Sequence, residues 1–63
     1  MKYYFVKFMI DGVSKDYESS SVFCIDKSAN HAEAFIEIKK RINESLENTH
    51  YILSYITHLK ELK

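Results

Sequence analysis

The chain has 63 residues, enough for a single domain, and we expect one domain over residues 1–63. Nine Lys and Arg balance nine Asp and Glu, so the strong positive field that favours nucleic acids or membrane surfaces is absent, and we expect no membrane association. The lone cysteine, Cys24, excludes an internal disulfide and suits a reducing compartment, so we expect a cytoplasmic protein.

The first predicted element is a strand from Lys2 to Asp11, where Tyr, Phe, Val and Ile dominate. Its even positions, from Tyr4 to Ile10, are all apolar. Its odd positions, from Tyr3 to Met9, are mostly apolar too. Two apolar faces indicate a central strand that is covered on both sides, and the sequence leaves open which face meets a helix.

The dipeptide Asp11-Gly12 predicts a hairpin turn, because glycine accepts the positive φ angle that a tight hairpin requires. A polar stretch up to Lys15 lengthens this loop. A second strand is expected from about Asp16 to Ile25, and the serines from Ser19 to Ser21 favour an edge position for it.

An amphipathic helix is predicted next, with two candidates for its start. Ser28 is a possible N-cap, and Asn30 with Glu33 is an alternative as a capping box. Lys39 falls at the rim of the apolar stripe, where its stem packs while its ammonium group reaches water. The helix is expected to end near Asn48-Thr49. Its apolar face is formed by Phe35, Ile38, Ile42 and Leu46, flanked by Ala32 and Ile36.

The segment from Tyr51 to Leu59 fits two patterns. As a strand, its odd-numbered residues share one face; as a helix, Ile52, Leu53, Ile56 and Leu59 form a stripe. Its density of Tyr, Ile and Thr favours the strand. The expected fold is therefore α+β: a ββαβ domain whose three-stranded antiparallel sheet has the order 2-1-3, with one helix packed on one face.

The titratable side chains form no recognisable catalytic or metal-binding pattern. His31, His50 and His58 lack the close pairs that structural zinc needs. Cys24 is expected to pack as a small apolar side chain. Catalytic carboxylates need a pocket that excludes water, and a domain with one helix has little volume for one. We expect no enzyme activity, no metal and no cofactor.

A single helix covers only one face of such a sheet, so the other face stays open. Contiguous exposed apolar surface is rare on monomers and usually marks an interface. We therefore expect a non-catalytic protein-binding module with a host or cellular protein as its partner. We also expect a homodimer through the same face, since so small a domain needs reinforcement. The predicted interface residues are Tyr3, Phe5, Lys7, Met9, Tyr51 and Tyr55.

Nucleic-acid binding is the alternative function. The basic run Lys39, Lys40 and Arg41 would contact phosphates while the aromatic sheet face stacks bases. Glu37 and Glu44 flank this run, and helical geometry spreads its charges around the helix. Protein binding is therefore favoured.

The length of the chain, its strand–strand–helix–strand order and the Asp11-Gly12 turn resemble a class of very small ββαβ proteins from phages and mobile elements. Some members of that class are anti-CRISPR proteins or other host-takeover proteins. The resemblance spans nearly the full chain and carries over no functional residue. It implies an inhibitor or adaptor that binds a host protein stoichiometrically.

Overall fold

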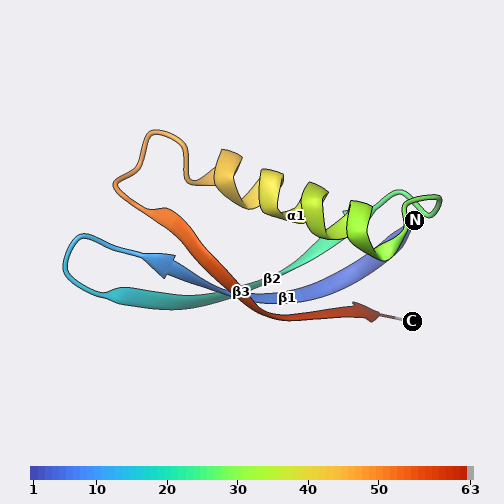
Figure 1. Cartoon of the computed structure of the whole chain (residues 1–63), viewed down its shortest axis with the longest axis horizontal. Coiled ribbons are helices and arrows are strands. Elements are labelled where there is room, and N and C mark those ends of the chain that lie inside the picture. Colours follow the sequence, from blue (N-terminus) through green and yellow to red (C-terminus); the bar gives the residue numbers. More distant parts are fainter. Residues whose placement is uncertain (63) are drawn as a thin grey trace.

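The computed structural model describes residues 1–62, and its elements follow in the order β1 (Lys2–Asp11), β2 (Asp16–Ile25), α1 (His31–Ser45) and β3 (Ile52–Leu62). The strands form one sheet in the order β2-β1-β3, and both neighbouring pairs are antiparallel. Helix α1 lies on one side of this twisted sheet, with no other described element on the opposite side (Figure 1). The predicted ββαβ topology is confirmed. Lys63, which the predicted domain includes, lies outside the described residues.

The core lies between α1 and the even-numbered face of β1, which answers the question that the sequence left open. Tyr4, Val6 and Phe8 contribute the β1 side, and each is at most 7% exposed. Ile10 packs against this cluster from its edge. The whole core consists of Tyr4, Val6, Phe8, Ile25, Ala34, Ile38 and Ile42.

The capping box starts the helix, and Ser28 does not. The Asn30 side chain accepts a hydrogen bond from the Glu33 backbone N–H (2.8 Å), and the Glu33 carboxylate accepts one from the Asn30 N–H (2.9 Å). Ser28 instead donates from its N–H and hydroxyl to the Asp26 carboxylate. The helix ends at Ser45, earlier than predicted, and Asn48 follows with a φ of 65°. No helix within residues 1–62 has the length and apolarity that crossing a membrane requires.

The buried face of α1 differs from the predicted one at three positions. Ala34 is fully buried, whereas Ala32 is exposed, and Ile36 is 65% exposed. Ile38 and Ile42 centre the buried stripe, and residues two apart lie about 200° apart around a helix, so Ile36 falls opposite Ile38. Lys39 lies at the rim as expected, with its ammonium nitrogen 5.1 Å from the centre of the Phe35 ring.

The hairpin between β1 and β2 needs its glycine for a different reason from the predicted one. The Gly12 N–H donates to the Lys15 carbonyl (3.0 Å), which closes the loop, but Gly12 does not have a positive φ. A Cβ atom at this position would lie 2.5 Å from the Lys15 carbonyl oxygen and 2.8 Å from the Tyr17 ring. Glycine is therefore required by close approach of the chain.

The last segment is a strand, as favoured, but its faces do not alternate as predicted. The register between β1 and β3 shifts twice, and the shifts leave Ser54 and Thr57 without a partner on β1. Because an extra residue reverses the alternation, the inward positions become Leu53, Ile56 and Leu59. This spacing of three explains why the same residues also resembled a helical stripe.

Candidate interaction surface

The sheet face turned away from α1 is referred to below as the open face. It carries the odd-numbered residues of β1, since the even-numbered ones enter the core. Residues directly opposite each other in antiparallel strands point to the same side of the sheet, so the register extends the face to β2 and β3. Its residues are Tyr3, Phe5, Lys7, Met9 and Asp11 from β1, Asp16, Glu18, Ser20, Val22 and Cys24 from β2, and Ile52, Tyr55, His58, Lys60 and Leu62 from β3.

One end of the open face is apolar. Tyr3 lies between Cys24 and Leu62, and Phe5 lies beside Val22. Tyr3, Val22 and Leu62 are 50%, 53% and 40% exposed, and Phe5 and Cys24 are half-buried. These five residues are called the apolar end. They form a contiguous group across all three strands, which is the arrangement expected of an interface and not of scattered surface residues.

The ionisable side chains of the rest of the open face fall into two zones. Lys7, His58 and Lys60 form the basic middle, where the His58 ring lies 6.4 Å from the Phe5 ring at an interplanar angle of 59°. Glu18, Asp16 and Asp11 follow toward the hairpin and are called the acidic end. The formal charge of the chain is zero, yet the open face separates its charges by sign.

The structure brings the predicted interface residues of β1 together with Tyr55, but not with Tyr51. Tyr55 lies opposite Met9 and is 56% exposed, and it also lines the groove between α1 and β3. Tyr51 precedes β3 and meets the Tyr17 ring edge-on on the helix side, at a centroid distance of 5.8 Å. With Ile10 and Leu46, these two tyrosines line a shallow, mostly apolar hollow away from the open face.

Several open-face residues were missed by sequence reasoning. Val22 and Cys24 were predictable in principle, because a loop that pairs Asp11 with Asp16 fixes every other β1–β2 partner. His58 and Lys60 were not, because their placement depends on the two register shifts.

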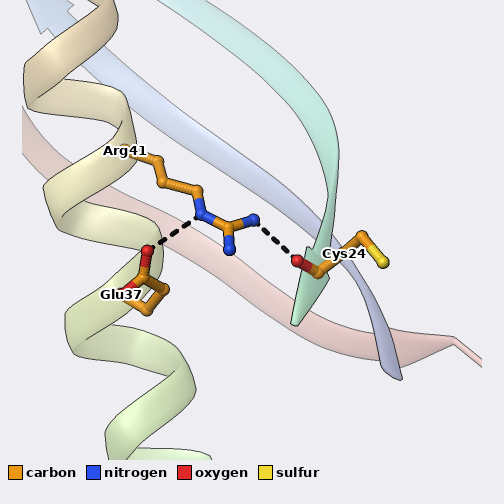
Figure 2. A network of polar contacts seen from close by, with 3 residues as sticks. All are labelled: Cys24, Glu37 and Arg41. Atoms are coloured by element: carbon orange, nitrogen blue, oxygen red, sulfur yellow. Dashed lines mark hydrogen bonds and ion pairs between the residues drawn. The ribbon is translucent and has the colours of Figure 1, made fainter. Parts of the chain in front are cut away.

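The basic run of the alternative function lies on α1, in the other layer of the molecule. Lys40 is exposed, and Lys39 lies against Phe35 on the side of β3. Arg41 turns toward β2, where its Nε donates to the Glu37 carboxylate (2.9 Å) and its Nη1 donates to the Cys24 carbonyl (2.6 Å), as Figure 2 shows. The three basic side chains are therefore spread around the helix and do not join the aromatic sheet face.

The shifted pKa values have structural causes. Burial, then the charge and hydrogen bond of Glu61, raise the pKa of Tyr4. A hydrogen bond with Asp11, followed by desolvation and the like charge, raises the pKa of Asp16 at the acidic end. Hydrogen bonds from the Ser28 N–H and hydroxyl lower the pKa of Asp26. Within residues 1–62 no group of three or more His, Cys, Asp or Glu side chains lies close enough to hold a metal ion.

Comparison of the chain with protein-family models, with curated proteins and with solved structures finds no match in any of the three. The resemblance to small phage proteins stays an expectation. The open face is the feature on which a function can be argued.

Proposed function

We propose that the chain is a non-catalytic protein-binding module that docks a partner protein on its open face. The observation that carries the proposal is the apolar end, where Tyr3, Val22 and Leu62 remain 40–53% exposed although the core is complete without them. Tyr and Phe side chains at such sites bury a large area for little lost conformational entropy, so they suit an interface. A stoichiometric inhibitor or adaptor of a host protein is the kind of function that fits.

The charges beside the apolar end indicate the chemistry of a complementary partner surface. Lys7 and Lys60 lie next to it, so a surface that joins apolar groups with carboxylates would be complementary. A second copy is a poor occupant of the same face, because Lys7 lies at the middle of β1 and full overlap of two open faces about a two-fold axis sets it against Lys7 of the other copy. Like charges brought together in an interface are unfavourable.

The test uses a pair of matched variants. Phe5→Glu places a charge at the apolar end, whereas Ile36→Glu places the same charge on the exposed side of α1, where Ile36 is 65% exposed. A partner captured by the wild type and by Ile36→Glu should be lost from Phe5→Glu. With that partner purified, titration calorimetry should show a dissociation constant raised at least about 100-fold by Phe5→Glu.

Capture of the same proteins by both variants would contradict the proposal, provided that circular dichroism shows both variants folded. Val22→Glu tests the apolar end from a different strand and should also abolish capture of the partner. Val22 is 53% exposed and lies opposite Phe5.

Single-stranded nucleic acid is the second candidate, and one observation favours it. Phe5, Tyr55 and His58 lie near Lys7 and Lys60 on the open face, the combination that stacks bases and neutralises phosphates. Titration of a labelled single-stranded RNA at increasing salt separates the candidates. Affinity that falls steeply with salt and that is lost in Lys7→Ala would replace the protein-binding proposal.

A further inference from the structure

The two edges of the sheet differ. The β3 edge is interrupted by two register shifts, and bulges of this kind hinder pairing with another strand. The β2 edge keeps one unbroken register with β1, from Lys2 opposite Ile25 to Asp11 opposite Asp16. β2 contains neither Lys nor Pro, the residues that commonly guard an edge, and the stretch from Ser19 to Ile25 carries no charge. The β2 edge is therefore the unprotected one.

The contact between Arg41 and Cys24 shows which backbone groups of β2 point outward. Arg41 reaches the Cys24 carbonyl from α1, not from β1 (Figure 2). In an antiparallel strand, the N–H and C=O of alternate residues point to opposite sides. The backbone groups of Glu18, Ser20 and Val22 therefore point outward with those of Cys24, whereas those of Ser21 and its alternate neighbours face β1. The hydrogen bond from the Gly12 N–H to the Lys15 carbonyl agrees with this, because it shows that the odd-numbered residues of this segment direct their backbone groups toward β1.

We propose that β2 is a docking edge for β2 of a second copy, which joins the two sheets into one antiparallel six-stranded sheet. Pairing centred on Ser20 sets Ser20 opposite itself and Glu18 opposite Val22, and it uses the outward backbone groups of all three residues. It also sets Asp16 opposite Cys24, whose carbonyl Arg41 already occupies. The acidic residues of the two copies stay apart, and the serine side chains at the centre are too small to obstruct the approach.

This arrangement has a consequence for the open face. A two-fold axis perpendicular to the sheet keeps both helices on one side and both open faces on the other. The dimer then presents one continuous surface across six strands. The inference goes beyond the proposed function and does not rest on it, because edge pairing leaves every open-face side chain in place.

Proline at Ser20 is the direct test. The Ser20 N–H points outward, so Ser20→Pro removes a donor needed by the second copy and no hydrogen bond between β1 and β2. Sedimentation velocity at a chain concentration of about 1 mM, which saturates dimers of micromolar dissociation constant, should show the wild type and the control Ser20→Ala as dimers. The measured mass of Ser20→Pro should be about half as large. A monomeric wild type, or a dimeric Ser20→Pro that is folded by circular dichroism, would overturn the proposal.

Hydrogen exchange of the unaltered protein gives a reading that does not depend on the variant folding. The Ser20 and Val22 amides point away from β1 and have no hydrogen-bond partner among residues 1–62, so they should exchange at least about tenfold more slowly at high than at low concentration. The Ser21 amide, which faces β1, serves as the internal reference. Ser20 and Val22 exchange rates that do not change with concentration would rule out the edge dimer. A dimer dispersed by Phe5→Glu and not by Ser20→Pro would assign self-association to the open face.

Discussion

The two faces of β1 have similar compositions and different surroundings. Tyr4, Val6 and Phe8 on the even face are buried beneath α1, whereas Tyr3 on the odd face is 50% exposed and Phe5 is half-buried. Apolar residues on both faces of a strand therefore have two separate causes here. One face builds the core, and the other is apolar beyond what this fold requires, which is why it is the candidate interaction surface.

The largest expected effect compares the two phenylalanines of β1. Phe8→Ala should lower the free energy of unfolding by about 3–5 kcal/mol, because it empties a site in the core. So small a core supplies about that much in total, so the variant should be largely unfolded. Phe5→Ala should cost only about 1 kcal/mol and leave the fold intact. Urea unfolding followed by circular dichroism measures both, and equal losses would remove the distinction between the faces.

The next effect tests whether α1 is what covers the even face. Ile38→Ala should cost about 2–4 kcal/mol, since Ile38 is fully buried in the core that α1 shares with β1. Ile36→Ala makes the same chemical change two positions away on the exposed side, and it should change stability by less than about 0.5 kcal/mol. Thermal unfolding of the two variants and the wild type measures the loss of stability in each. A large loss from Ile36→Ala would mean that the helix is rotated differently on the sheet.

A smaller effect concerns the contact that ties α1 to β2. Arg41→Ala should cost about 1 kcal/mol, because it removes the hydrogen bond to the Cys24 carbonyl. Glu37→Ala removes only the ion pair, in which both side chains are 40% exposed, and should cost a few tenths of a kcal/mol at most. Chemical denaturation of both variants separates the two contributions. Equal effects would assign the stabilisation to the ion pair instead.

The smallest effect lies at the acidic end of the open face. The folded-state pKa of Asp16 is raised, so this group contributes stability that is present below its ordinary pKa of about 4 and is lost as the pH rises through the folded-state pKa. Asp16→Asn should therefore be more stable than the wild type at neutral pH. The difference in stability between the two proteins should shrink as the pH falls. Melting temperatures across this pH range measure it, with Glu18→Gln as the control for removing one charge. A gap independent of pH would contradict the interaction with Asp11.

The elements with local signals were predictable from the sequence. The residues of β1 favour a strand by themselves, the hairpin loop is marked by Gly12, and the capping box at Asn30 was recognised as one of two possible helix starts. The strand order followed from the connections together with the two apolar faces of β1, which place it in the middle of an all-antiparallel sheet. The covered face of β1 was not predictable, because both of its faces are apolar.

Features that depend on contacts distant in sequence were not predictable. Ser54 and Thr57 are left unpaired by the way β3 fits β1, and no local pattern marks them as bulge residues. The predicted grouping of Tyr51 with the open face failed for this reason, since it assumed strict alternation. The reason for Gly12 was also missed, because it lies in the approach of Lys15 and Tyr17 and not in the φ angle.

The pairing of β1 with β3 joins residues separated by nearly the whole sequence, with Tyr3 opposite Leu62. Closing so long a loop costs conformational entropy before any contact between these strands forms. The hairpin of β1 and β2 needs only a short loop, so we expect it to form early and β3 to dock late. Until β3 arrives, one edge of the central strand is bare, and folding at high concentration gives other chains the opportunity to occupy it.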